Sequence, residues 1–148
     1  MSPTRLRERP TTILLVEDRI PDARLIQEIL YKDQGPTIVR VAQDGDEALA
    51  YLRREGEHVS APRPHLVVLD LGLPGRSGLD VLREIKADPD FRGIPVVVFT
   101  TSAAPSEIEE VYALHANAYI VKPVGLDAFT NVLSDIKKFW LDVAQLPE

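Results

Sequence analysis

The stretch LVVLDLGLPGRSG, residues 66–78, decides the fold of this chain. It opens with four apolar residues, Leu66–Leu69, and such a run is typical of a strand that is buried on both faces. Asp70 ends the run, and a loop rich in proline and glycine follows. Ser77 three residues before Asp80 then indicates the start of a helix. A buried strand, an acidic residue, a tight loop and a helix together indicate one unit of an α/β protein.

The same alternation recurs along the rest of the chain. Further short apolar runs are Thr12–Val16, Thr37–Val41, Val96–Phe99 and Ala118–Val121. Amphipathic stretches with helical spacing lie between the runs and after the last one, at about 23–30, 44–52, 77–85, 106–115 and 129–143. Five strands that alternate with five helices predict a parallel sheet with right-handed crossovers.

Residues with reactive side chains follow four of the predicted strands. Glu17 and Asp18 follow the first strand, Asp70 the third, Thr100 the fourth and Lys122 the fifth. The carboxyl ends of parallel strands meet at one edge of the sheet, so these groups should lie together. Three neighbouring carboxylates repel one another unless a cation compensates them, and Mg²⁺ suits oxygen ligands that phosphate oxygens complete. A carboxylate nucleophile, a metal, an ammonium and a hydroxyl are what phosphoryl transfer to a protein requires.

Composition narrows the class of protein further. With 148 residues the chain is long enough for one domain, and it contains no cysteine for a disulfide or a thiolate site. The net charge of −6 argues against binding to nucleic acid. No stretch is as apolar as a membrane span or a secretory signal, and we expect a cytoplasmic protein. We expect a disordered lead-in over 1–10, one domain over 11–143 and a short tail over 144–148.

Four motifs, taken together, resemble the receiver domain of bacterial two-component response regulators. They are ILLVED at 13–18, LVVLDLGLPGRSG at 66–78, VVVFTTS at 96–102 and YIVKP at 119–123. The resemblance implies a (βα)5 flavodoxin-like fold, a three-layer sandwich whose five-stranded parallel sheet has the order 2-1-3-4-5. It also implies a signalling protein, not an enzyme, that receives its phosphoryl group from a sensor histidine kinase.

The resemblance assigns a role to each residue at the predicted sheet edge. Asp70 would be the phosphoacceptor, and it would bind Mg²⁺ together with Glu17, Asp18 and the backbone carbonyl of Gly72. Glu17 stands where many receivers have aspartate, but it is still a carboxylate. Gly72 offers no side chain two residues after the phosphoacceptor, where other receivers often carry one that affects the access of water. The lifetime of the phosphoryl group is therefore open.

The resemblance also implies a switch. Thr100 and Lys122 would hold phosphoryl oxygens, and Tyr119 occupies the place of an aromatic residue that rotates on phosphorylation. The surface of the fourth helix, the fifth strand and the fifth helix would change as a result. The bond between Lys122 and Pro123 matches the position of a cis peptide in the family.

A narrower similarity concerns one subgroup of receivers. GEHVSAPRPH at 56–65, TTS at 100–102, LHANAY at 114–119 and FWL at 139–141 resemble the single-domain regulators that are paired with bacterial phytochrome histidine kinases. This resemblance implies a homodimer, and the adjacent aromatic residues Phe139 and Trp140 would form an association surface.

Other functions stay possible at this stage. A phosphohydrolase with an aspartyl-phosphate intermediate needs a second aspartate two residues after the nucleophile, and Gly72 cannot serve as that acid. A flavin-binding module would need neutral donors after the first strand, where this chain has Glu17, Asp18 and Asp22. Within the receiver interpretation, the chain could also be a phosphate sink or a relay intermediate without an output of its own.

Overall fold

The computed structural model describes residues 10–31 and 36–148, so the predicted lead-in lies outside the described residues except for Pro10. The described elements alternate between strands and helices as predicted. In chain order they are β1 (Thr11–Val16), α1 (Ile20–Tyr31), β2 (Thr37–Ala42), α2 (Gly45–Arg53), the 3₁₀ turn η1 (Gly56–His58), β3 (Leu66–Leu69), α3 (Gly78–Ala87), β4 (Val96–Thr100), α4 (Pro105–Ala113), β5 (Ala118–Val121), α5 (Leu126–Lys137) and the π-helical segment η2 (Lys138–Val143).

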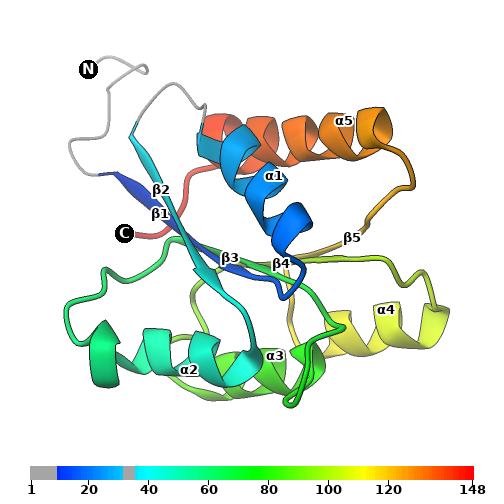
Figure 1. Cartoon of the computed structure of the whole chain (residues 1–148). Helices are drawn as coiled ribbons and strands as arrows, with labels where there is room; N and C mark the ends of the chain where they lie inside the picture. Colours follow the sequence, from blue (N-terminus) through cyan, green and yellow to red (C-terminus); the bar gives the residue numbers. More distant parts are fainter. Residues whose placement is uncertain (1–9, 32–35) are drawn as a thin grey trace.

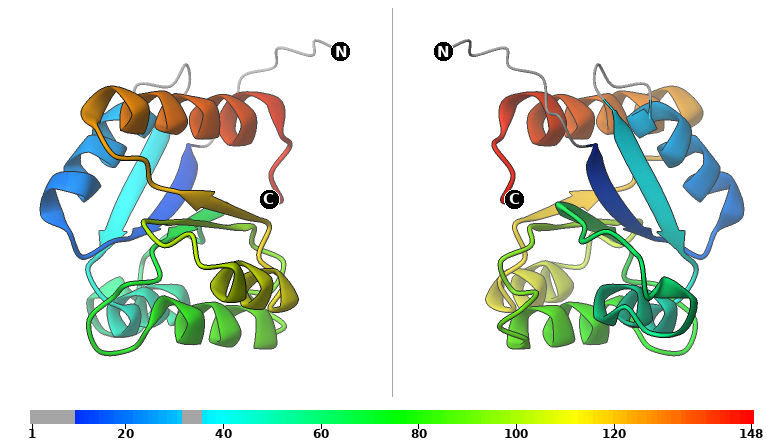
Figure 2. Two further views of the ribbon diagram at one scale, coloured as in Figure 1. Left: turned by 90° about the vertical axis from the view of Figure 1, so that its right-hand side faces the viewer. Right: turned by 90° about the vertical axis from the view of Figure 1, so that its left-hand side faces the viewer.

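The strands form one parallel sheet in the order β2-β1-β3-β4-β5. This order confirms the predicted flavodoxin-like topology. Helices α1 and α5 cover one face of the sheet, and α2, α3 and α4 cover the other (Figure 1). The two side views in Figure 2 show the same three layers, with the twisted sheet in the middle.

The core divides into two clusters because successive strand residues point to opposite faces of the sheet. In β1, Leu14 and Val16 belong to the cluster beneath α2 and α3, whereas Ile13 and Leu15 belong to the cluster beneath α1 and α5. These four side chains are at most 1% exposed. Burial of both faces explains why β1 reads as a continuous apolar run in the sequence.

Side chains cap two of the helices at the residues that the sequence indicated. Asp44 accepts a hydrogen bond from the Glu47 backbone N–H at 2.7 Å, at the start of α2. Ser77 accepts one from the Asp80 backbone N–H at 3.2 Å, at the start of α3. Each bond satisfies a backbone donor that the helix itself leaves without a partner.

The C-terminal helix differs from its prediction. The apolar stripe over 129–143 predicts one continuous α-helix, but α5 ends at Lys137 and η2 continues as a π-helix. The Ala144 backbone N–H donates to the Phe139 carbonyl at 2.7 Å, which is the i→i+5 spacing of a π-helix. The helix predicted from about Ser106 to His115 is confirmed as α4 (Pro105–Ala113), with ends that differ by one and two residues. Among the described residues, every helix is too short or too polar to cross a bilayer.

Candidate functional site

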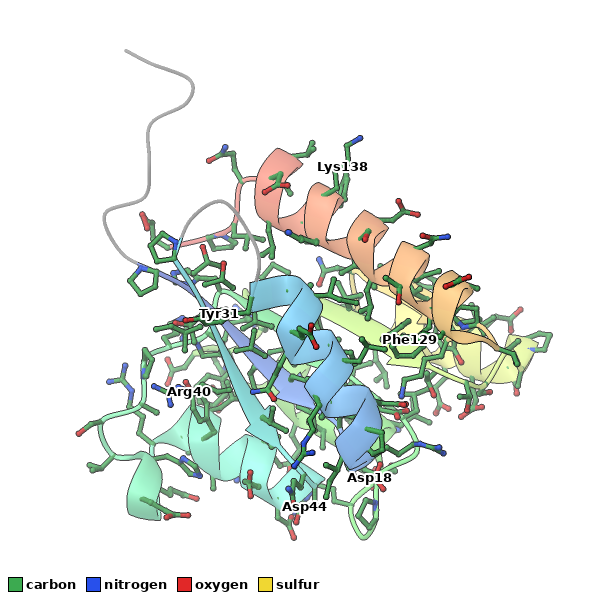
Figure 3. The ribbon with its side chains drawn as sticks, turned by 45° about the horizontal axis from the view of Figure 1, so that its top comes forward. Asp18, Tyr31, Arg40, Asp44, Phe129 and Lys138 are labelled. Atoms are coloured by element: carbon green, nitrogen blue, oxygen red, sulfur yellow. The ribbon has the colours of Figure 1, made fainter. Side chains whose placement is uncertain are left out.

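Backbone hydrogen bonds between strands bring the predicted site residues to one edge of the sheet. The Asp70 N–H donates to the Val16 carbonyl at 3.0 Å, which places the end of β3 beside the end of β1. The Lys122 N–H donates to the Thr100 carbonyl at 2.7 Å, which ties the end of β5 to the end of β4. Figure 3 shows Asp18 and Asp44 at this end of the molecule, far from Tyr31 and Lys138 at the other end.

Asp70 is buried, with 8% of its surface exposed, and the loop after it holds its position. The Gly72 backbone N–H donates to Asp70 Oδ1 at 3.2 Å. The Gly78 N–H donates to the Leu71 carbonyl at 3.0 Å, so α3 begins directly against the end of β3. A β-carbon on Gly72 would meet nothing within 4 Å, so the space beside Asp70 is open at that position.

The Lys122 ammonium is the centre of the site. Its Nζ lies 2.5 Å from Glu17 Oε1, 3.0 Å from Asp70 Oδ2 and 3.1 Å from Asp22 Oδ2. An ammonium has three protons, so each carboxylate accepts one of them. The lysine side chain is 2% exposed, and the ion pairs with Glu17 and Asp70 are shielded from water.

Asp22 was missed as a site residue by the sequence analysis, which considered it only as an obstacle to a flavin phosphate. It lies in the first turn of α1, and its side chain is 24% exposed. Arg19 Nε is also 3.7 Å from the same Asp22 oxygen. The position of Asp22, in the first turn of the helix that directly follows Glu17 and Asp18, was the available signal that its carboxylate lies near the same site.

The buried carboxylates respond to this environment in opposite directions. Burial, followed by the repulsion from Asp70, raises the pKa of Glu17 to about 7 against the opposing effects of Lys122 and the Arg19 N–H. Burial also raises the pKa of Asp70, but the bond and charge of Lys122 and the donors from Gly72 and Thr100 outweigh it, so the pKa is lowered.

The opposite shifts agree with the exposure of the two groups. The Glu17 side chain is 1% exposed and that of Asp70 is 9% exposed, so desolvation weighs more on Glu17. Burial lowers the pKa of Lys122, but its bonds to Glu17 and Asp70 prevail and raise it. Asp70 is therefore ionised at neutral pH, and Lys122 is charged.

Glu17, Asp18 and Asp70 form an acidic cluster. Each contributes one carboxylate oxygen, and these oxygens all lie within 4.8 Å of one another. With Asp22, the site has four carboxylates, three of which contact the Lys122 ammonium, so negative charge is in excess. A small divalent cation with oxygen ligands fits this donor set in both charge and geometry.

Thr100 and Tyr119 lie on the β4–β5 side of the site. Thr100 is 3% exposed, and its hydroxyl lies near enough to Asp70 to help lower the pKa of that carboxyl. Tyr119 is half-buried, and its hydroxyl donates to the Ser102 carbonyl at 2.8 Å. Tyr119 is thus linked by a backbone carbonyl to the loop that follows Thr100.

The expectation of a cis peptide before Pro123 is wrong for this structure, since the Lys122–Pro123 bond is trans. The trans form is favoured for bonds to proline by about 0.5–1 kcal/mol in the absence of other constraints. The Lys122 ammonium reaches all three of its carboxylate partners from this backbone.

The fold and this arrangement of three carboxylates, a hydroxyl and a lysine define a class of signalling protein. The profile of the response regulator receiver domain matches residues 13–134. The chain therefore belongs to the response regulator receiver domain family. It is a receiver-domain response regulator of two-component signal transduction, and receivers of this kind work with a sensor histidine kinase.

The relatives that resemble this chain over nearly its whole length include the response regulator Rcp1. The response regulator Rcp1 of Synechocystis sp. is 42% identical over 138 residues, which is 93% of this chain and 94% of Rcp1. A crystal structure of Rcp1 in its Mn²⁺-bound form has a TM-score of 0.91 and covers 94% of this chain and all of that one.

Two other similar solved structures are those of phytochrome response regulators. The phosphorylated cyanobacterial phytochrome response regulator RcpA is 46% identical, with a TM-score of 0.91 over 95% of this chain and 100% of RcpA. The bacteriophytochrome response regulator AtBRR is 40% identical, with a TM-score of 0.70 over 95% of this chain and 99% of AtBRR. The predicted similarity to phytochrome-associated regulators is confirmed.

Proposed function

We propose that this chain accepts a phosphoryl group from a sensor histidine kinase on Asp70, in a reaction that requires Mg²⁺. The observation that carries the proposal is that Asp70 is an ionised carboxylate which contacts Lys122, belongs to the acidic cluster and is more exposed than Glu17. A nucleophile must be ionised and within reach of its substrate. Glu17 is less suited on both counts. Burial raises its pKa to about 7, and its side chain is less exposed than that of Asp70.

The transfer to Asp70 requires no proton to be removed from it, because its carboxylate is already ionised. An Asp70 oxygen attacks the phosphorus of a phosphohistidine, and the new P–O bond forms as the P–N bond breaks. The electron pair of the broken bond stays on the imidazole nitrogen of the kinase. Lys122, which already bonds to Asp70, and the nearby Thr100 hydroxyl would then bind phosphoryl oxygens, because negative charge moves outward onto the phosphate.

Glu17, Asp18, Asp70 and the backbone carbonyl of Gly72 would hold the cation. Mg²⁺ bound there would neutralise charge on the carboxylates and on the transferring phosphoryl group. The proximity of the three carboxylate oxygens and the excess of negative charge support this assignment. The Mn²⁺-bound form of Rcp1, a relative that matches 94% of this chain, also supports it.

Tyr119 would report the state of the site to the surface. Its hydroxyl is bonded to the carbonyl of Ser102, two residues after Thr100. A movement of Thr100 toward the phosphoryl group would displace Ser102 and release Tyr119 from this bond. The surface formed by α4, β5 and α5 would then change, and that surface is the proposed output.

Gly72 also favours a switch over a phosphohydrolase. It follows Asp70 by two residues, where an aspartyl-phosphate phosphohydrolase carries its proton donor, and it has no side chain to transfer a proton. We therefore propose that the acyl phosphate is a signal and not an intermediate of rapid hydrolysis.

The partner of this chain would be a phytochrome-type histidine kinase in the cytoplasm. The sequence identity to Rcp1, RcpA and AtBRR over nearly the whole chain supports this assignment. The receiver domain would span 11–143, and a tail would follow over 144–148.

The chain would also form a homodimer. Phe139 is 53% exposed and Val143 is 61% exposed, and both lie on η2. Analytical ultracentrifugation of the native protein and of Phe139→Ser tests the dimer. The native protein should sediment as a dimer, and the variant should dissociate more readily. Sedimentation of both proteins as monomers would contradict the homodimer.

Phosphotransfer tests the function. A sensor histidine kinase is phosphorylated with labelled ATP, purified and mixed with native chain, Asp70→Asn or the matched control Asp90→Asn, which changes an exposed aspartate in the loop after α3. Label should move to the native chain and to Asp90→Asn only when Mg²⁺ is present, and Asp70→Asn should stay unlabelled. Equal labelling of all three, or labelling in EDTA, would contradict the proposal.

A further inference from the structure

The third contact of Lys122 has no part in the proposed cation site. Lys122 Nζ donates to Asp22 Oδ2 at 3.1 Å, in addition to its bonds with Glu17 and Asp70. Asp22 comes from the first turn of α1, whereas Glu17 and Asp70 follow strands. The ammonium is therefore held by groups from three separate segments.

Lys122 and a divalent cation compete for the same two carboxylates. Glu17 and Asp70 both bond to the ammonium, and both belong to the acidic cluster of three carboxylates. A cation bound at the cluster would take Glu17 and Asp70 as ligands, so these carboxylates would compensate the charge of Lys122 less well. An ammonium that is 2% exposed cannot lose its partners without cost, because a buried charge needs compensation.

Asp22 is the partner that cation binding leaves in place. Among the described residues, the mutually close carboxylates of the cluster are Glu17, Asp18 and Asp70, so Asp22 lies outside it. Its side chain is 24% exposed, compared with 1% for Glu17 and 9% for Asp70, so it lies on the solvent side of the ammonium. Arg19, the other cation near Asp22, is farther away at 3.7 Å and is 67% exposed.

We infer that Asp22 is a positioning residue, which holds the Lys122 ammonium beside the site while a divalent cation occupies Glu17 and Asp70. This inference rests on the proposed function. Asp22 contacts neither the cation nor the phosphoryl group; it compensates Lys122 so that the cation and the lysine can be present together. Without Asp22, Lys122 would retain Glu17 and Asp70 more strongly, and the cation would bind less well.

A double-mutant cycle separates this role from a general loss of negative charge. Mg²⁺ affinity is measured by calorimetry for the native chain, Asp22→Asn, Lys122→Met and the double variant. We expect Asp22→Asn to weaken Mg²⁺ binding about threefold to tenfold, within the coupling range of contacting residues. In the Lys122→Met background the same change should have little effect, because no ammonium remains to be held.

Asp80→Asn provides a matched control. Asp80 lies in the first turn of α3 and pairs with Arg83 three residues later, just as Asp22 lies in the first turn of α1 and pairs with Arg19. Both variants lose one negative charge and one favourable interaction with a helix N-terminus. Mg²⁺ affinity of Asp80→Asn should equal that of the native chain, and Asp22→Glu should restore part of the affinity that Asp22→Asn loses.

The outcomes distinguish this inference from the proposed function. Failure of the native chain to bind Mg²⁺ or to accept a phosphoryl group would overturn the proposed function. Normal binding and transfer by the native chain, with Asp22→Asn equally weakened in the presence and absence of Lys122, would overturn the role of Asp22 alone. An unchanged Mg²⁺ affinity in Asp22→Asn would do the same.

Discussion

A β-carbon on Gly78 would lie 2.2 Å from the carbonyl oxygen of Asp70. It would also lie 2.6 Å from the Cα of Leu71, so the first residue of α3 is packed against the backbone of Asp70 and Leu71. Both neighbours are main-chain atoms that no rotation of a side chain can move. The position of the Asp70 carboxylate thus depends on the absence of a side chain eight residues later.

Gly78→Ala should therefore destabilise the fold and disturb the site together. Helix propensity alone would favour alanine by up to about 1 kcal/mol, but a clash with backbone atoms costs about 1–3 kcal/mol or more. We expect a net loss in the free energy of unfolding, measured with urea, and slower phosphorylation. Gly93→Ala is the control, because a β-carbon there meets nothing within 4 Å. Equal stability of the two variants would show that the loop absorbs the extra atom.

Gly72→Met should change the lifetime of the acyl phosphate without changing stability. Gly72 is exposed, and a β-carbon at this position meets nothing within 4 Å. A methionine side chain there would extend over the open space beside Asp70 and hinder the attack of water. We expect label on the variant to decay several-fold more slowly than on the native chain, with the same urea midpoint. A faster decay would mean that the side chain does not cover the phosphoryl group.

Mg²⁺ affinity should fall as the pH is lowered below neutrality. Because burial raises the pKa of Glu17 to about 7, a proton and the cation compete for its carboxylate. Below that pH the affinity should fall by up to about tenfold per pH unit, the limit for one displaced proton. Calorimetry from roughly pH 6 to roughly pH 8, about one unit on either side of the raised pKa of Glu17, measures this fall in affinity. Glu17→Gln should bind more weakly throughout but lose this dependence; a parallel slope in both proteins would contradict it.

The same group links pH to stability when no cation is bound. The unfolded chain releases the Glu17 proton near the ordinary value of 4.5, whereas the folded chain keeps it until about 7. The folded state therefore holds more protons in this interval, and the Glu17 contribution to the free energy of unfolding decreases as the pH rises through it. Urea unfolding of native protein and Glu17→Gln in EDTA should show this decrease in the native chain only.

Lys122→Ala should separate metal binding from switching. The variant loses the ammonium that competes for Glu17 and Asp70, so Mg²⁺ should bind at least as tightly as in the native chain. It also loses a clamp on the phosphoryl oxygens. With beryllium trifluoride, which mimics a phosphoryl group on aspartate, NMR shifts of residues in α4, β5 and α5 should be much smaller than in native protein. Shifts as large as those of the native protein would show that Lys122 has no role in the conformational switch.

The sheet and most of the site could be predicted because they depend on local patterns. Each strand is buried on both faces, so its residues form one apolar run, and the reactive residue follows where the run ends. Asp70 after Leu66–Leu69 is the clearest example. The parallel topology then brings Glu17, Asp70 and Lys122 to one edge without further information.

Other features depend on contacts that the local pattern does not contain. Asp22 and Lys122 are separated by 100 residues, and the surface position of Asp22 in α1 is equally typical of a favourable helix start. The change from the α-helix α5 to the π-helix η2 could not be predicted, because the apolar stripe in the sequence continues through both. There the Phe139 and Trp140 rings pack edge to face at 5.1 Å, and Trp140 contacts the core cluster beneath α1 and α5.

The most direct test of the central claim is to identify the phosphorylated residue. After transfer from a phosphorylated histidine kinase, reduction with borohydride converts an aspartyl phosphate to homoserine, and mass spectrometry of peptides locates the change. We predict homoserine at position 70 in the native chain and none in Asp70→Asn. Modification at Asp18, or a phosphorylated chain in which residue 70 is still aspartate, would contradict the account.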